Sequence, residues 1–172
     1  EKQSDGSLLA HMEDGSSVET DLILYATGRK PLVEGLGFAE AGIDMAENGA
    51  IKVDQYYKTN IDNIYAIGDV IDKVQLTPVA LAEGMAVVNT LFKNTPSSVD
   101  YSNIATAVFC QPNIGTVGLT EQEAIAQFDE IDVYESTFRA LKHTVSGSSE
   151  QTMMKMIVDK SSDKVIGVHM VG

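Results

Sequence analysis

The residues best placed to do chemistry are an acid and a helix start that follow one another closely. An apolar run, residues 64–67, ends in Gly68–Asp69, and Leu76–Pro78 then opens a helix. A buried strand that delivers an acid at its carboxyl end, followed by a helix start, is the arrangement of a nucleotide site in an α/β sheet. The carboxylate of Asp69 can accept hydrogen bonds from sugar hydroxyls, and N–H groups at the helix start can face an electron-rich ligand. A solvated turn is the alternative for an isolated Gly-Asp pair.

Three motifs, in this order, resemble those of the pyridine nucleotide–disulfide oxidoreductases. Thr59–Leu81 resembles the second FAD-binding signature of that family. Upstream, Tyr25–Pro31 resembles the ATGRxPN element with a shortened ending, and downstream Phe109–Glu121 resembles the opening of the interface domain. The sequence IGTVGLTE within that last stretch, with FRALKHTVSG at 138–147, is most similar to the glutathione reductase branch.

The resemblance implies a mixed α/β and α+β fold in three parts. Residues 1–31 would be the end of an NADPH-binding domain, and residues 32–95 the C-terminal part of an FAD-binding domain. Residues 96–172 would be an incomplete α+β interface domain that dimerises around an antiparallel sheet. A change to strand-dominated sequence after Pro96–Ser98 favours that boundary. Both ends look cut, because a hairpin opens the chain and a strand closes it, so we expect a piece of a larger protein.

Hydrophobic patterns in the first half predict a hairpin, short strands and one helix. The hairpin covers residues 7–26 around Asp14-Gly15, and its return strand is apolar on both faces at 22–26. Short strands are expected at 42–45 and 51–54. Thr77 is the expected N-cap of the helix, with Pro78 at its first position. The helix is expected to bury the face that carries Val79, Ala82, Ala86, Val87, Thr90 and Leu91.

The second half reads as a sheet interrupted by one helix. Thr120 and Glu123 form a capping box that opens this helix. A polar turn at 159–163 joins the last two strands. The expected strands are 106–109, 114–119, 133–138, 153–158 and 165–171.

The resemblance implies cofactor roles for five residues. Asp69 would hold the ribityl or pyrophosphate part of FAD. Thr77, through its backbone N–H, would face the flavin ring and favour negative charge there. Gly28 and Gln75 fall where the family contacts NADPH, and Arg29 lies beside them. Structural alternatives remain open: a surface ion pair for Arg29, a solvated turn for Gln75 and close packing for Gly28.

Substrate contacts are less clearly implied. Met85 stands where many glutathione reductases have a basic residue, so this segment offers no charge to a glutathione carboxylate. Arg139, Lys142 and His143 are the other cationic candidates, with an exposed polar stretch as the alternative. His143 and His169 have no acidic partner at a fixed spacing, so neither is expected to be a general acid.

No catalytic residue is expected in this chain. It lacks the CxxxxC redox pair, the GxGxxG phosphate loop and the HPTxxE segment that carries the family's catalytic histidine. We therefore expect the parent to be an NADPH-dependent, homodimeric glutathione-disulfide reductase and the chain alone to be inactive. Dihydrolipoamide dehydrogenase, mercuric reductase and a non-catalytic dimerisation module are the alternatives. NADPH cannot be distinguished from NADH, since the residues that grip the 2′-phosphate would precede Glu1.

Composition excludes several other classes of function. With 172 residues and a net charge of −13, the chain is not expected to bind nucleic acid or an anionic membrane surface. It has no long apolar span and no signal-like start. Its single cysteine, Cys110, rules out an internal disulfide, which favours a reducing, cytoplasmic setting. One cysteine and three histidines cannot assemble a zinc site, so no metal is expected.

Overall fold

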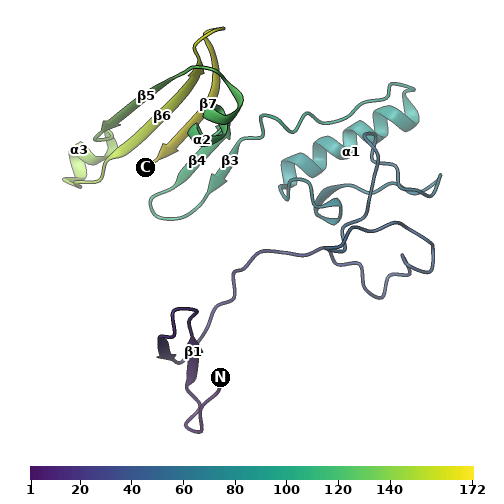
Figure 1. Cartoon of the computed structure of the whole chain (residues 1–172), viewed down its shortest axis with the longest axis horizontal. Coiled ribbons are helices and arrows are strands. Elements are labelled where there is room, and N and C mark those ends of the chain that lie inside the picture. The colour runs from purple at the N-terminus through teal and green to yellow at the C-terminus, as the bar shows by residue number, and fades with distance from the viewer. The chain divides into compact units, whose positions relative to one another are not determined.

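A computed structural model describes all 172 residues, and the chain divides into two compact units. The first unit is Glu1–Ser98 and the second is Val99–Gly172. Figure 1 shows a hairpin, loops and a long helix in the first unit, and a sheet with short helices in the second. No helix is both long and apolar enough to cross a bilayer.

The chain opens with the predicted hairpin, which is shorter than expected. Strand β1 (Leu8–His11) pairs antiparallel with β2 (Ser17–Thr20). Gly15 has a φ of +83°, which suits a tight turn. The predicted continuation of the return strand to Ala26 is wrong: residues 22–26 form no strand, and Leu24 is 85% exposed. A strand needs a neighbour to satisfy its backbone groups, and this chain places none beside that run.

The remaining strands predicted in the first unit are reduced to single bridges. Met45 pairs with Ile51 around a turn in which the Gly49 N–H donates to the Ala46 carbonyl at 2.9 Å. Lys58 pairs with Tyr65 in the same way. The buried strand predicted at residues 64–67 is therefore wrong as a strand, for the same reason as the run at 22–26.

Helix α1 (Thr77–Phe92) follows a short 3₁₀ turn, η1 (Gly68–Ile71). The predicted N-cap is wrong by one residue. Leu76 is the N-cap in extended conformation, and its carbonyl accepts from Ala80 N–H at 3.1 Å, so Thr77 is already helical and caps nothing with its side chain. The buried positions of the helix are Val79, Glu83 and Ala86. Val79 and Ala86 were predicted to be buried. Ala82 and Leu91 were also predicted to be buried, but they are exposed.

The second unit is a five-stranded antiparallel sheet, as predicted. The strand order is β3-β4-β7-β6-β5. The ladder puts Tyr134 opposite Met156 and Met156 opposite Val168. The strands are β3 (Thr106–Val108), β4 (Ile114–Gly118), β5 (Ile131–Phe138), β6 (Thr152–Asp159) and β7 (Lys164–Val171).

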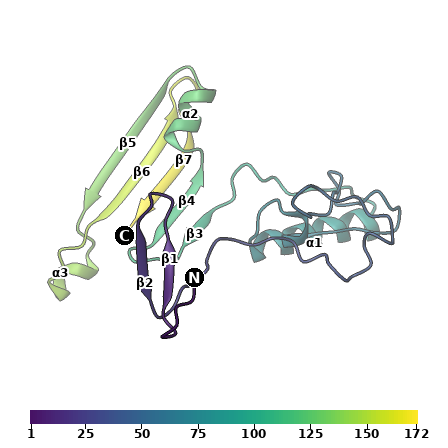
Figure 2. The same cartoon turned by 60° about the horizontal axis from the view of Figure 1, so that its bottom comes forward.

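Two short helices accompany this sheet. Helix α2 (Glu121–Gln127) lies beside β5 and buries Ala124 completely (Figure 2). Its capping box is confirmed: the Glu123 N–H donates to Thr120 Oγ1 at 3.3 Å, and the Thr120 N–H donates to Glu123 Oε2 at 2.9 Å. Helix α3 (Lys142–Ser146) was not predicted, because five residues carry too short a pattern to register as a helix.

Candidate cofactor site

The turn η1 carries the acid that the sequence singled out. Gly68 is buried with a φ of +71°, a conformation that glycine adopts without strain. Asp69 follows it with its side chain 47% exposed. The carbonyl of Val70 accepts a hydrogen bond from the Ile51 N–H at 3.0 Å, which connects the turn to the segment bridged by Met45 and Ile51. The chain thus presents the Asp69 carboxylate at the surface on an anchored backbone.

Arg29 reaches this carboxylate from a distant part of the sequence. Its Nη1 donates to Asp69 Oδ2 at 3.1 Å. Gly28 precedes it with a φ of +103°, and Pro31 beyond it is buried. The surface ion pair, which was the structural alternative for Arg29, is therefore present, with Asp69 as its partner. A carboxylate can accept from hydroxyls and a guanidinium can bind phosphate, so the pair offers both functions of a nucleotide site.

Gln75 is held by a second carboxylate close to the turn. Asp72 accepts from Gln75 Nε2 through one oxygen and from Asn48 Nδ2 through the other, both at 2.6 Å. Asp72 itself has a φ of +49°. Because Gln75 uses its amide nitrogen to donate to Asp72, its carbonyl oxygen remains available as an acceptor. The alternative of a purely solvated turn residue does not describe this half-buried side chain.

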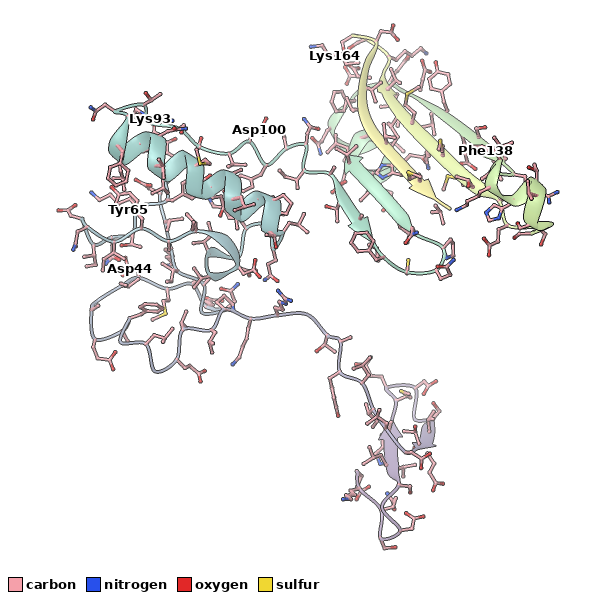
Figure 3. The ribbon with its side chains drawn as sticks, turned by 180° about the vertical axis from the view of Figure 1, so that it is seen from behind. Asp44, Tyr65, Lys93, Asp100, Phe138 and Lys164 are labelled. Carbon is pink, nitrogen blue, oxygen red and sulfur yellow. The ribbon has the colours of Figure 1, made fainter.

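A cavity of about 370 Å³ brings three of the five predicted residues together. The paired side chains of Arg29 and Asp69 both line it, and Gln75 lines it as well. Figure 3 shows the segment around the labelled Tyr65, which leads into η1, running beside α1. The full lining is Arg29, Lys30, Pro31, Leu32, Asp69, Val70 and Gln75. This mixture of cations, an acid and apolar groups fits the phosphate and hydroxyl groups of a dinucleotide better than an apolar ligand.

Thr77 and Gly28 are close in sequence to this cavity but do not line it. Thr77 is exposed, and its backbone N–H donates to no group of the chain, because the first helical turn has no intrahelical acceptor for it. That free donor fits the predicted contact with a ligand. The space around the Gly28 α-carbon is open, so close packing does not explain this glycine, although its positive φ does.

Sequence reasoning missed one residue of this region. Glu83 lies on α1 with only 1% of its surface exposed, and it accepts from the Gly68 N–H at 2.6 Å. Its position could have signalled this role. It lies four residues after Val79 and three before Ala86, which places an acid within the buried stripe of the helix.

The predicted substrate-side residues occur in both units of the chain. Met85 is 54% exposed on α1. In the second unit, Arg139 donates to the His143 carbonyl at 2.6 Å, and His143 Nε2 lies 3.5 Å from a carboxylate oxygen of Glu150, a partner that sequence spacing did not indicate. Lys142 is exposed.

His169 and Cys110 have structural surroundings. His169 Nε2 donates to the Leu119 carbonyl at 2.9 Å, and its Nδ1 meets the Thr116 hydroxyl, so both ring nitrogens are engaged within the sheet. The exposed thiol of Cys110 donates to the Pro112 carbonyl at 2.9 Å.

Two family profiles match the chain. Residues 1–84 match the pyridine nucleotide-disulphide oxidoreductase profile, and residues 104–172 match the dimerisation domain of the same family. The chain is 45% identical over 171 residues to the chloroplastic/mitochondrial glutathione reductase of Pisum sativum, covering 99% of this chain and 31% of that protein. It is 42% identical over 173 residues to the trypanothione reductase of Trypanosoma congolense, covering 100% of this chain and 35% of the relative.

Solved structures agree with these matches. The HOCl-induced flavoprotein disulfide reductase RclA of Escherichia coli superposes with a TM-score of 0.82 at 29% identity, over 95% of this chain and 38% of that one. The chain spans about a third of the length of the curated relatives it matches. Because both profiles describe one family and together match residues 1–84 and 104–172, the chain belongs to the pyridine nucleotide-disulphide oxidoreductase family.

Proposed function

We propose that this chain is part of a longer FAD- and NADPH-dependent reductase whose substrate is glutathione disulfide. The observation that carries the proposal is the cavity lined by Arg29, Asp69 and Gln75, in a chain that aligns over its length with glutathione reductases. FAD supplies electron transfer between a nicotinamide and a disulfide in such a protein.

The chain's own residues would bind and orient this cofactor. Asp69 would hold the ribityl or pyrophosphate part of FAD by accepting hydrogen bonds from the ribityl hydroxyls, and Arg29 would balance the negative charge of the adjacent phosphates. The free N–H of Thr77 donates to an electron-rich edge of the flavin at the start of α1. Asp69 lies on η1 and Thr77 on α1, whose contacts already hold the backbone there, so these two groups need little ordering on binding.

Gly28 and Gln75 would contact the nicotinamide cofactor. Asp72 accepts from the Gln75 amide nitrogen, which leaves the carbonyl oxygen of Gln75 as an acceptor for an amide donor such as a carboxamide. NADPH rather than NADH is part of the proposal by analogy with the relatives, because the residues that would read a 2′-phosphate are not within this sequence.

The parts of the chain would divide the work as the resemblance implied. Residues 1–31 close the NADPH-binding domain, 32–95 complete the FAD-binding domain, and 96–172 belong to the interface domain of a homodimer. The match to a dimerisation domain over residues 104–172 supports the last assignment. Because a dithiol is needed for disulfide exchange and the chain has one cysteine, we expect no turnover from these 172 residues alone. The proposed compartment is the reducing cytoplasm.

A second candidate substrate is the disulfide form of trypanothione. Trypanothione reductases match this chain almost as well as glutathione reductases do, at 42% against 45% identity. Met85, which brings no positive charge to the substrate-side helix, favours a substrate other than glutathione disulfide at that point.

The decisive test is a reductase assay on the longer protein that carries this chain. NADPH oxidation is followed with glutathione disulfide, trypanothione disulfide and lipoamide in parallel, with the 172-residue chain as the matched control. Turnover with glutathione disulfide only, and none from the control, supports the proposal. Turnover with another disulfide reassigns the substrate, and a protein that purifies without flavin and cannot take it up refutes the cofactor assignment.

A further inference from the structure

Glu83 is the most deeply buried charged side chain of the first unit. It projects from the middle of α1 with 1% of its surface exposed. Burial of a carboxylate costs free energy unless it is paired or accepts hydrogen bonds. A residue that merely filled space on this helix face would be apolar, as Val79 and Ala86 are. The acid at this position therefore points to a specific contact.

That contact is with the backbone of the turn that carries Asp69. Glu83 accepts from the Gly68 N–H at 2.6 Å. A hydrogen bond to a carboxylate is about twice as strong as one between neutral groups, and in a buried setting its loss leaves the donor unsatisfied. Gly68 is the residue immediately before Asp69, so the bond acts one peptide away from the ligand-facing side chain.

Packing contacts hold the same turn against the same face of α1. A β-carbon on Gly68 would lie 3.2 Å from the Ala80 β-carbon, so the backbone sits directly on the helix there. One on Gly84 would lie 3.4 Å from Ile67 Cδ1, which shows the preceding residue packed alongside. On α1, Glu83 lies between Ala80 and Gly84 in the sequence, so its hydrogen bond is flanked by these two contacts. Packing sets the distance between turn and helix, and the bond sets the rotation of the peptide.

We propose that Glu83 is a positioning residue for the cofactor site. By accepting the Gly68 N–H it fixes the start of η1 and so directs the Asp69 carboxylate toward the cavity that Arg29 and Gln75 share. Glu83 acts through Asp69 and does not touch the ligand. This inference rests on the proposed function, because the ligand of Asp69 is assigned there.

The test compares three variants of the longer protein that carries this chain. Glu83→Met keeps the volume but cannot accept the Gly68 N–H, whereas Glu83→Gln keeps an acceptor oxygen. Val79→Ala is the matched control, since it removes a buried apolar group from the same helix face and leaves the carboxylate of Glu83 in place. The readouts are the dissociation constant for FAD and amide hydrogen exchange of the peptide covering residues 66–71.

We expect Glu83→Met to raise the dissociation constant for FAD about ten-fold and to speed exchange at residues 66–71. Glu83→Gln should stay within about three-fold of the wild type on the same scale, and Val79→Ala should leave the dissociation constant unchanged. The proposal is overturned if Glu83→Met binds FAD like the wild type. It is also overturned if Glu83→Gln or Val79→Ala raises the dissociation constant for FAD as much as Glu83→Met does.

The exchange readout separates this inference from the proposed function. A wild-type protein that binds no FAD refutes the proposed function. Hydrogen exchange at residues 66–71 still reports on the bond between Glu83 and Gly68 in that case, because it requires no cofactor. Unchanged exchange in Glu83→Met would then overturn the role of Glu83 in fixing the turn.

Discussion

Arg29 and Asp69, forty positions apart in the sequence, form an ion pair with 3.1 Å between Nη1 and Oδ2. The pair joins the two signatures that the sequence presented separately, the ATGR-like element and the Gly-Asp turn. Both side chains are substantially exposed, so the pair contributes at most about 1 kcal/mol to stability. Its consequence is electrostatic, because a cation and an anion both line one cavity.

Asp69→Asn should weaken FAD binding without destabilising the protein. Loss of the charged acceptor weakens its hydrogen bonds to ligand hydroxyls, so we expect the dissociation constant to rise about ten-fold while the thermal midpoint stays nearly constant. Fluorescence titration with FAD measures the first and a thermal melt the second. Asp62→Asn is the control, because it breaks the exposed Lys58–Asp62 pair away from the cavity. Equal effects of the two substitutions would contradict a role for Asp69 in binding.

Gly68→Ala should destabilise the first unit more than Gly49→Ala. Both glycines have positive φ, +71° and +85°, so both variants carry the backbone strain of about 1 kcal/mol. Only at Gly68 would the new β-carbon crowd its neighbour, because the Ala80 β-carbon would lie 3.2 Å away. At Gly49 the nearest atom, Val33 Cγ2, would lie at an ordinary 3.7 Å. Denaturant unfolding of both variants measures the difference, and equal losses would show that contact with Ala80 is relaxed without cost.

The second unit could be predicted almost completely from local patterns. Each strand there lies beside another strand of the same chain, so a largely apolar run such as residues 153–158 forms a strand. The capping box at Thr120 is equally local, since both of its partners lie within one helical turn. The observed strand ends differ from the predicted ones by at most two residues.

The first unit could not be predicted to the same extent, because several strands predicted there have no partner strand in this chain. Residues 22–26 and 64–67 have strand-like composition, but no neighbouring strand in this chain pairs with either of them. The site residues Arg29, Asp69 and Gln75 were predicted from motifs, and their meeting in one cavity follows from the fold. The bond from Gly68 to Glu83 crosses fifteen positions and involves a backbone group, which no side-chain pattern encodes.

Thr120→Ala should destabilise the second unit by about 1 kcal/mol, the usual cost of losing an N-cap side chain. The hydroxyl accepts from the Glu123 N–H, and alanine leaves that donor without a partner in the chain. Thr120→Ser is the control, because it keeps the hydroxyl and should lie within a few tenths of a kcal/mol of the wild type. Urea unfolding followed by circular dichroism gives both values. A loss in the serine variant as large as in the alanine variant would assign the effect to the methyl group instead.

The turn between β6 and β7 should make stability sensitive to acid. Hydrogen bonds from Ser162 and then Ser161 lower the pKa of Asp159 below its ordinary value of 3.8. Because the folded pKa is depressed, this stabilisation is fully present above that ordinary value and is lost as the pH falls through the lower folded pKa. Asp159→Asn should therefore reduce stability at neutral pH and flatten the acid side of a plot of unfolding free energy against pH. Asp163→Asn makes the same change of charge in the same turn and should keep the wild-type slope. If Asp159→Asn kept that slope as well, the acid sensitivity would have to arise at other carboxylates.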